Sequence, residues 1–245
     1  MRTGQRGGGR NGSGELRMAR AEGLMAFYAD IDPENVEDYR RWHNCEHMEE
    51  RVRIPGFLRG RRYRGYDGAP GFLMSYETET AAVLGSPAYH AALNAPTAWT
   101  KRALTWFRNP VRSIYGLLAE TGEVPWRAAP YLLAARFNVP ADAEPAFLSD
   151  LGPALLRGAV DGAAVPRARL YAIDEAISAM MTSERKIYGG GPGNQKFLVL
   201  VEAMAPFAEI PAGRMPDAAT FASVGATDLF LDLLSIDFAL EAPVR

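Results

Sequence analysis

The sequence contains a single cysteine, no long apolar run and almost no net charge. Cys45 on its own cannot form an internal disulfide, which favours a reducing, cytoplasmic setting. No apolar segment approaches the ~20 residues that a membrane-spanning helix needs, so we expect no membrane partner. The formal net charge of −2 gives no electrostatic basis for binding nucleic acid. Hydrophobic residues still make up 48% of the 245 residues, enough for one large core or two smaller ones.

The first 20 residues are rich in glycine, arginine and serine and contain no apolar stretch. Such a segment cannot bury enough surface to fold, and it lacks the apolar region of a signal peptide. We therefore expect residues 1–20 to form a disordered extension.

An internal repeat organises the rest of the chain. Residues 59–63 (RGRRY) match residues 167–171 (RARLY), an offset of 167 − 59 = 108. Residues 72–77 match residues 197–202 at an offset of 125, so the second copy carries 125 − 108 = 17 extra residues. These include Gly189-Gly190-Gly191-Pro192-Gly193, which predicts a flexible loop. We expect a first repeat over 21–120, a linker over 121–129, and a degenerate second repeat over 130–245.

Each repeat has the pattern strand, helix, strand, strand, helix, strand. Short apolar or alternating runs predict strands at 24–30, 57–66, 72–78, 111–119, 131–139, 164–173, 197–203 and 229–240. Longer segments with capping and proline signals predict helices at 32–52, 80–107, 142–160 and 216–224, the second broken near Pro87 and Pro96. The order predicts an α+β fold of two tandem ferredoxin-like repeats. Each would be an antiparallel four-stranded sheet with helices on one face, and the two would pack as a barrel-like pseudo-dimer.

Two of the three histidines lie four residues apart on the first predicted helix. With Glu46 and Glu50, His43 and His47 form the only dense cluster of acid–base groups in the chain. At ~100° per residue, Tyr39 and the cluster should share one helix face. A neighbouring stripe of the same helix is apolar and consists of Trp42, Cys45, Met48 and Val52. Arg40 and Arg51 are expected on the side that faces solvent. A nearby carboxylate would raise a histidine pKa.

The second repeat provides an internal comparison for this cluster. At the offset of 108, its four members fall on Leu151, Ala154, Leu155 and Gly158. Polar groups that replace apolar ones near a core need partners or a cavity. The sequence therefore predicts a polar pocket in the first repeat only.

Three motifs in the first repeat point to a known family: Trp42-His43-x-x-Glu46-His47, then Ile54-Pro55-Gly56-Phe57, then Arg61-Arg62-Tyr63. They resemble the dimeric α/β-barrel superfamily and, more narrowly, EthD-like proteins, over most of residues 22–120. The resemblance implies a small-molecule protein, and relatives include lactone isomerases, polyketide cyclases, dehydratases, cofactor-free monooxygenases and haem enzymes. A fold with so many activities does not choose among them.

We expect a cofactor-independent acid–base enzyme of isomerase, cyclase or dehydratase type, acting on a hydrophobic small molecule with a carbonyl or phenol group. His43 or His47 would move the proton and Glu46 or Glu50 would orient the imidazole. The expected substrate-binding residues are Tyr39, Trp42, Arg62, Tyr63, Tyr76, His90, Asn94 and Trp99.

Three alternatives stay open: a cofactor-free monooxygenase using the same pocket, a non-catalytic binding protein, and a zinc hydrolase. The last rests on His-x-x-Glu-His, with Glu120 or Glu123 as a third ligand. We expect neither metal nor cofactor, because zinc peptidases lack repeated α/β units and no second-half histidine is present to ligate haem. Chains of two repeats could also associate as a homodimer.

Overall fold

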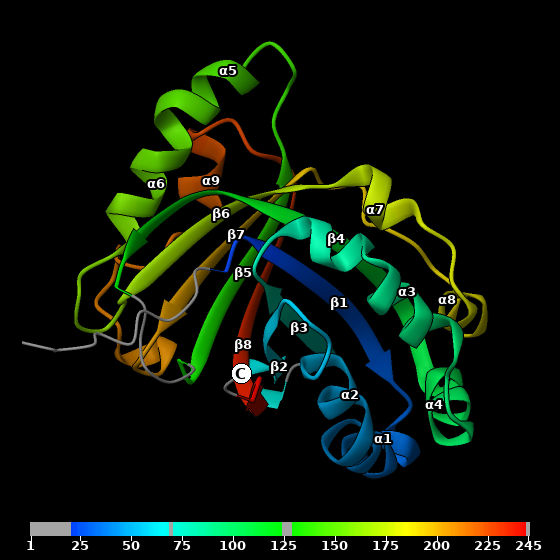
Figure 1. The fold of residues 1–245 in the computed structure, drawn as a ribbon. Coiled ribbons are helices and arrows are strands. Elements are labelled where there is room, and N and C mark those ends of the chain that lie inside the picture. Colours follow the sequence, from blue (N-terminus) through cyan, green and yellow to red (C-terminus); the bar gives the residue numbers. More distant parts are fainter. Residues whose placement is uncertain (1–20, 69–70, 124–128, 244–245) are drawn as a thin grey trace, which may run out of the picture.

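The computed structural model describes residues 21–68, 71–123 and 129–243 (Figure 1). The expected N-terminal extension and most of the expected linker lie outside these residues. Eight strands close into a barrel in the order β1-β3-β2-β8-β5-β7-β6-β4. Their bounds are β1 Gly23–Ile31, β2 Phe57–Gly65, β3 Phe72–Thr78, β4 Phe107–Gly122, β5 Tyr131–Asn138, β6 Arg167–Ile173, β7 Phe197–Ala203 and β8 Thr227–Glu241.

Each repeat contributes a four-stranded antiparallel sheet with the same strand order. Its fourth strand pairs with the second strand of the other repeat, β4 with β6 and β8 with β2, so the sheets join at their edges. Strand pairing agrees with the sequence offsets of 108 and 125. Arg59 pairs with Glu77 in the first repeat, and their counterparts Arg167 and Glu202 pair in the second. The expected fold of two ferredoxin-like repeats is confirmed. One boundary differs, because β4 continues through Gly122 into the expected linker.

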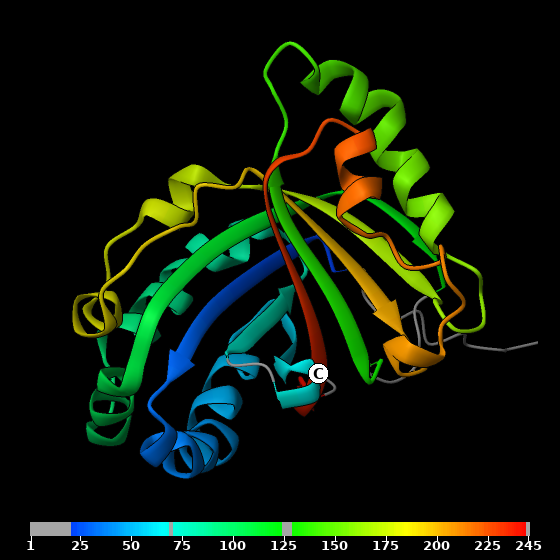
Figure 2. The same ribbon diagram turned by 180° about the vertical axis from the view of Figure 1, so that it is seen from behind.

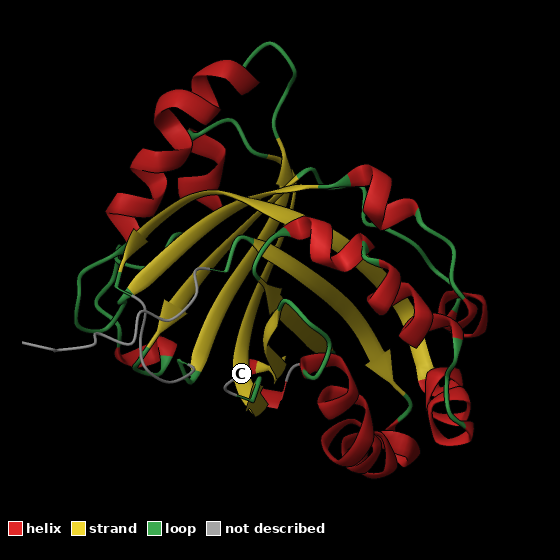
Figure 3. Cartoon of the chain, in the orientation of Figure 1, coloured by secondary structure: helices red, strands yellow, loops and turns green. Residues whose placement is uncertain are grey.

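The helices lie on the outside of the barrel, in two groups at opposite sides (Figure 3). In the first repeat they are α1 Val36–Trp42, α2 Met48–Val52, α3 Pro87–Asn94 and α4 Ala98–Ala103. In the second repeat they are α5 Glu144–Ala146, α6 Gly152–Ala159, α7 Glu175–Ala179, α8 Ser183–Tyr188 and α9 Ala218–Ser223. Side-chain caps define several starts: Ser86 accepts from Tyr89 N–H, Thr97 from Thr100 N–H, and Asp217 from Thr220 N–H. None of the described helices is long and apolar enough to cross a membrane.

The buried side chains form three cores. One lies between the first sheet and its helices, the second lies between the second sheet and α6 and α9, and the third fills the barrel with Leu and Tyr side chains. Alternate residues of each strand therefore enter a helix-covered core and the barrel interior. Seven of the strands are buried on both faces over part of their length, whereas β8 has a single buried residue, Leu234.

The 17-residue insertion of the second repeat is more than the expected flexible loop. It contains α7 and α8, which Figures 1 and 2 show running beside α3 and α4 of the first repeat. Ile177 and Tyr188 pack against the first repeat's core. The glycine segment that follows is fixed to β4, because Arg112 N–H donates to Gly191 O at 2.8 Å. Gly190 has φ 69°, and a Cβ there would lie 2.3 Å from Pro110 O, so a side chain does not fit.

Three of the four arginines of β2 are buried. Arg59, Arg61 and Arg62 are all at most 5% exposed, and only Arg64 faces solvent. The reason is tertiary, since closure against β8 leaves β2 with no free edge. Arg59 and Arg61 share one face of β2 with Tyr63, and that face lies inside the barrel.

A buried ion cluster fills the end of the barrel where Arg59 and Arg61 lie. Arg169 donates to Glu77 at 3.0 Å and to Glu202 at 2.7 Å, so it links equivalent glutamates of the two repeats. Arg61 Nη1 lies 3.4 Å from Glu77 Oε1. Burial alone would raise the pKa of Glu77, but the arginines, Arg169 foremost, hold it well below its usual range. The two sheets are thus joined by charge as well as by strand pairing.

Candidate active site

A π-helical turn at His43–His47 sets the orientation of the histidine cluster. Met48 N–H donates to His43 O, the i to i+5 bond of a π turn, between α1 and α2. The wider turn rotates the residues after it relative to an ideal α-helix. Cys45 is therefore exposed, although the sequence placed it on the buried stripe, and Arg51, expected to face solvent, is 2% exposed.

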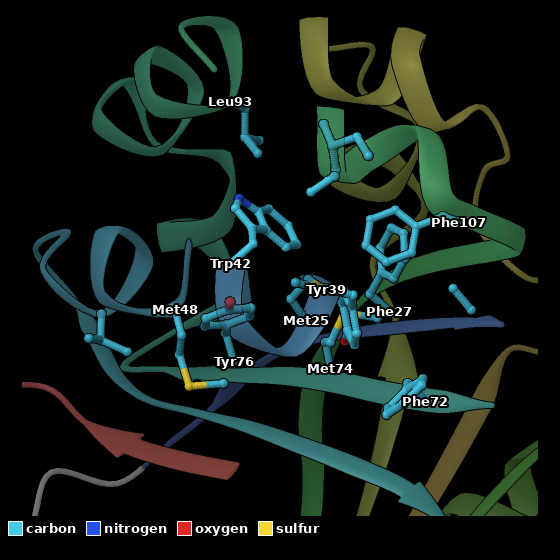
Figure 4. Packing of buried hydrophobic residues seen from close by; sticks show 14 of the residues in the cluster. Met25, Phe27, Tyr39, Trp42, Met48, Phe72, Met74, Tyr76, Leu93 and Phe107 are labelled. Atoms are coloured by element: carbon cyan, nitrogen blue, oxygen red, sulfur yellow. The ribbon is translucent and has the colours of Figure 1, made fainter. Parts of the chain in front are cut away.

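A small cavity lies between this helix, the outer face of the first sheet, and α3 and α8. It has a volume of about 30 Å³, room for one or two water molecules. Figure 4 shows Trp42 extending from α1 between Leu93 and Tyr76, with Phe27 and Phe107 to one side. The cavity is lined by Met25, Phe27, Trp42, His43, His47, Arg51, Met74, Tyr76, Tyr89, Leu93, Leu104, Phe107, Arg112, Glu184 and Tyr188.

A chain of buried hydrogen bonds runs from β8 to this cavity. Arg62 Nε donates to Asp237 at 2.7 Å, and Arg62 Nη1 lies 3.2 Å from His43 Nδ1. Because a guanidinium can only donate, Nδ1 accepts, and the proton of neutral His43 is assigned to Nε2. Nε2 lies 3.3 Å from the Tyr76 hydroxyl oxygen and donates to it. The Tyr76 proton is then free for a third group, and each bond polarises the next.

His43 is neutral in this arrangement. Burial lowers its pKa well below 6.5, and the charges of Arg62 and Arg51 lower it further. Burial likewise raises the pKa of Tyr76 well above 10, so its hydroxyl stays protonated and can donate. His43 therefore transmits the polarity of Arg62 to Tyr76 and has no nitrogen left for a substrate proton.

His47 is the histidine with a free nitrogen. Its ring stacks on Trp42 with 4.4 Å between centroids, and its Nδ1 is buried with no hydrogen-bond partner among the described residues. Burial lowers its pKa well below 6.5, with Arg51 and His43 acting in the same direction. A neutral imidazole with an unused lone pair can accept a proton.

The two glutamates of the cluster do not orient either imidazole. Glu46 accepts from Thr97 Oγ1 at 2.6 Å and from Thr100 Oγ1 at 3.0 Å, which ties α1 to α4. Thr100 in turn accepts from Trp42 Nε1 at 3.1 Å. Glu50 is half-buried, and its burial raises the pKa of its carboxyl. The expected carboxylate-raised histidine pKa is wrong, because burial lowers the pKa of both imidazoles and the neighbouring arginines lower it further.

Three charged residues of the cavity wall were not found from the sequence. Arg51 forms a buried ion pair with Glu184, which comes from α8 in the insertion. Arg112 on β4 donates to the Tyr89 hydroxyl at 3.3 Å and forms no ion pair within the part of the chain that the structure describes; its charge faces the same cavity. Two arginines against one glutamate leave the wall with a net positive charge. No local signal marks Glu184, because only the fold brings the insertion to the first repeat.

The second repeat lacks the site entirely, although its helix aligns differently than expected. Its π turn is Phe147–Leu151, so this helix segment has an offset of 147 − 43 = 104. His43 then corresponds to Phe147, and Arg51 to Leu155. The strand offsets place Leu170 and Val201 opposite Arg62 and Tyr76. The four counterparts are apolar and belong to the second core. The site is one-sided, as expected, but Glu46 now corresponds to the acidic Asp150.

The other expected substrate-binding residues lie outside the cavity wall. Tyr63 points into the barrel, and Tyr39 packs beside His43 at 5.8 Å between ring centroids. Trp99 packs on the first core from α4, and His90 is partly exposed on α3. Asn94 accepts from Ser183 N–H at 2.9 Å, so it holds α8 against α3.

The residues present do not fit the zinc reading. His43 already uses both nitrogens, one toward Arg62 and the other toward Tyr76. Glu120 pairs with Arg167. Among the residues that the structure describes, no three His, Cys, Asp or Glu side chains gather as a metal site.

Comparisons with known proteins bear on the fold. A scan against protein-family models and a search of curated proteins find no match. Similar solved structures include a proposed monooxygenase from Fusobacterium nucleatum (7% identity, 90% of this chain and 95% of that chain, TM-score 0.58). An anthrone oxidase-like protein is 10% identical over 92% of this chain and 95% of its own, with a TM-score of 0.58. A proposed monooxygenase from Lactobacillus acidophilus is 8% identical over 90% of this chain and 97% of its own, with a TM-score of 0.55. This likeness extends over both repeats and supports the ferredoxin-like α/β-barrel fold.

Proposed function

We propose that the protein is an enzyme that removes a proton from a hydrophobic small molecule bearing a carbonyl or phenol group, without a cofactor. The proposal rests on two groups that line the same cavity. One is neutral His47, whose Nδ1 has no hydrogen-bond partner among the described residues, and the other is the Tyr76 hydroxyl, which Arg62 polarises through His43. One group can accept a proton and the other can donate a hydrogen bond. Both line one small, net positive cavity.

In this mechanism His47 is the general base. An imidazole with a lowered pKa is a weak base, so the site must stabilise the anion that remains on the substrate. Tyr76 would donate to the developing enolate or phenolate oxygen, and the positive charges of Arg51 and Arg112 would stabilise it in a low-dielectric setting. Return of the proton to another carbon gives isomerisation, loss of hydroxide from the β-carbon as water gives dehydration, and attack of the enolate carbon on a second carbonyl of the same molecule gives cyclisation.

The cavity must widen to admit a substrate, since about 30 Å³ holds only one or two waters. Met25 and Met74 form part of its wall, and methionine side chains repack at low cost because they are unbranched and flexible. The other wall is α8, which is held by the Arg51–Glu184 pair and by Asn94. We expect binding to displace the methionines and to leave this polar frame in place.

Proton transfer can be measured directly by exchange of acidic C–H hydrogens with D2O, followed by mass spectrometry. Anthrone and 2-tetralone are suitable probes, because both are ring ketones with an acidic CH2 group. We expect His47→Gln to slow exchange roughly 10²–10⁴-fold and Tyr76→Phe about 10²-fold. Cys45→Ser, on the exposed side of the same turn, is the matched control. Normal exchange by a folded His47→Gln variant would refute the proposal.

A cofactor-free monooxygenase is the second candidate, and the names of the structural neighbours bring it into consideration. It would begin with the same deprotonation, after which O2 accepts electrons from the substrate anion. Oxygen uptake that depends on His47 and on anthrone would favour it over isomerisation. Binding of the probes without exchange or oxygen uptake would leave the non-catalytic binding protein. The closer relation to EthD-like proteins remains part of this proposal.

A further inference from the structure

A second and much larger cavity opens at the end of the barrel opposite the ion cluster. Tyr28 pairs with Leu73 near one end of β1, whereas Leu24 pairs with Glu77 of the ion cluster near the other. The cavity has a volume of about 430 Å³, within the range of small-molecule sites. It shares no lining residue with the histidine cavity.

The insertion builds one wall of this cavity. Pro192, Gly193, Asn194 and Gln195 line it directly after the segment that is fixed to β4. Gly193 N–H donates to Ser113 Oγ at 3.0 Å, which holds the wall in place. The other walls come from the ends of β1, β3, β5 and β8, and from β4.

The centre of the cavity breaks the symmetry of the two repeats. The offset of 108 relates Tyr28 to Arg136, so one repeat brings a phenol where the other brings a guanidinium. Arg136 lies over the Tyr28 ring at 3.8 Å and over the Phe230 ring at 5.1 Å. Its Nη2 also donates to Asp232 at 3.3 Å. The guanidinium is therefore fixed between two aromatic rings and a carboxylate.

Two polar groups at this centre are buried and have no partner among the described residues: the Tyr28 hydroxyl and Arg136 Nε. Burial raises the pKa of the Tyr28 phenol far above its ordinary value, so it is a neutral O–H donor. Arg136 Nε–H is also a donor. Buried donors without acceptors are rare in folded proteins and each costs free energy, so a bound acceptor would stabilise both.

The charges around the donors select the kind of acceptor. Asp232 balances Arg136, and Asp30 adds a further carboxylate to the wall. An anionic ligand would meet this excess of negative charge, whereas a neutral carbonyl oxygen would not. Phe230 and the Tyr28 ring provide flat apolar surface beside the donors. We propose that the open end of the barrel is a second ligand site, which binds a neutral aromatic carbonyl compound through Tyr28 and Arg136.

The test uses coumarin, a soluble neutral bicyclic lactone, and 2H-chromene, a similar bicycle without the carbonyl. Titration into the full chain, followed by NMR, should shift the side-chain amide signals of Asn194 and Gln195 and leave the Trp42 indole N–H signal unchanged. We expect chromene to bind at least about tenfold more weakly, and Tyr28→Phe to weaken coumarin about fivefold, the effect of one neutral hydrogen bond.

Three results would overturn the proposal. The first is no saturable binding of coumarin, and the second is equal affinity for the two compounds. The third is a shift confined to Trp42, which would place the ligand in the histidine cavity. Phe230→Leu, which keeps an apolar wall but removes one ring from Arg136, should weaken both compounds alike, so the ratio of their affinities reports on the hydrogen bonds alone.

Discussion

Substitution of His43 by glutamine should flatten the dependence of stability on pH. His43 is fully buried and its pKa is lowered well below 6.5 by burial, Arg62 and Arg51, whereas in the unfolded chain its pKa is ordinary. Below pH ~6.5 the unfolded chain takes up a proton that the folded protein excludes. The contribution of His43 is therefore complete above that pH and is lost as the pH falls. The slope approaches about 1.4 kcal/mol per pH unit.

The same substitution carries a cost near neutral pH. Glutamine cannot accept from Arg62 and donate to Tyr76 in the positions of both imidazole nitrogens, so about 2 kcal/mol of buried hydrogen bonding is lost. Dividing this loss by the slope of about 1.4 kcal/mol per unit predicts that the two stability curves meet about 1.5 pH units below 6.5, near pH ~5.

Urea unfolding of both proteins at a series of pH values, followed by circular dichroism, measures these curves. His90→Gln is the control for removing an imidazole, because His90 is partly exposed on α3 and away from the chain of hydrogen bonds. The wild type should lose stability faster than His43→Gln below pH ~6.5. Parallel curves would refute the reasoning, because they would show that His43 binds the same number of protons in both states.

Glu184→Gln should cost about 3 kcal/mol in urea unfolding, because it leaves the Arg51 charge buried without its partner. The double variant Arg51→Met, Glu184→Leu should recover most of that loss, and equal loss in both variants would show that the charge pairing is unimportant. Gly158→Ala should raise stability by about 0.5–1 kcal/mol, since a Cβ there meets nothing within 4 Å on α6. Gly23→Ala should lower the melting temperature, because its Cβ would lie 2.4 Å from the Thr80 carbonyl carbon; an unchanged value would contradict the packing. Proton exchange that depends on neutral His47 should be constant above pH ~6.5 and decline only below it, and a decline above neutrality would exclude His47 as the base.

Much of the fold follows from local pattern. The strand expected at 72–78 is β3 Phe72–Thr78, and the helix expected at 32–52 is observed with a π turn in it. That turn is where the reasoning from sequence failed in part, because an ideal 3.6-residue period misplaces Cys45 and Arg51, although Met48 and Val52 are buried as expected. Arg51 is therefore buried and Cys45 exposed, the reverse of what the sequence predicted. No residue type marks a π turn, so the error could not be seen in the sequence.

The sequence by itself determined that this chain is two copies of one α/β unit and that only the first carries the cluster of two histidines and two glutamates. Repeats, periodicity and composition are local properties, and they survive in the linear chain. Only the tertiary structure decided which hydrogen bonds and charged neighbours that cluster has. Arg62 comes from a neighbouring strand, Glu184 from the insertion of the other repeat, and their distances to the π turn depend on closure of the barrel. Burial and long-range charge then turned a histidine pair expected to be protonated into a neutral one, because desolvation acts only once the chain has folded.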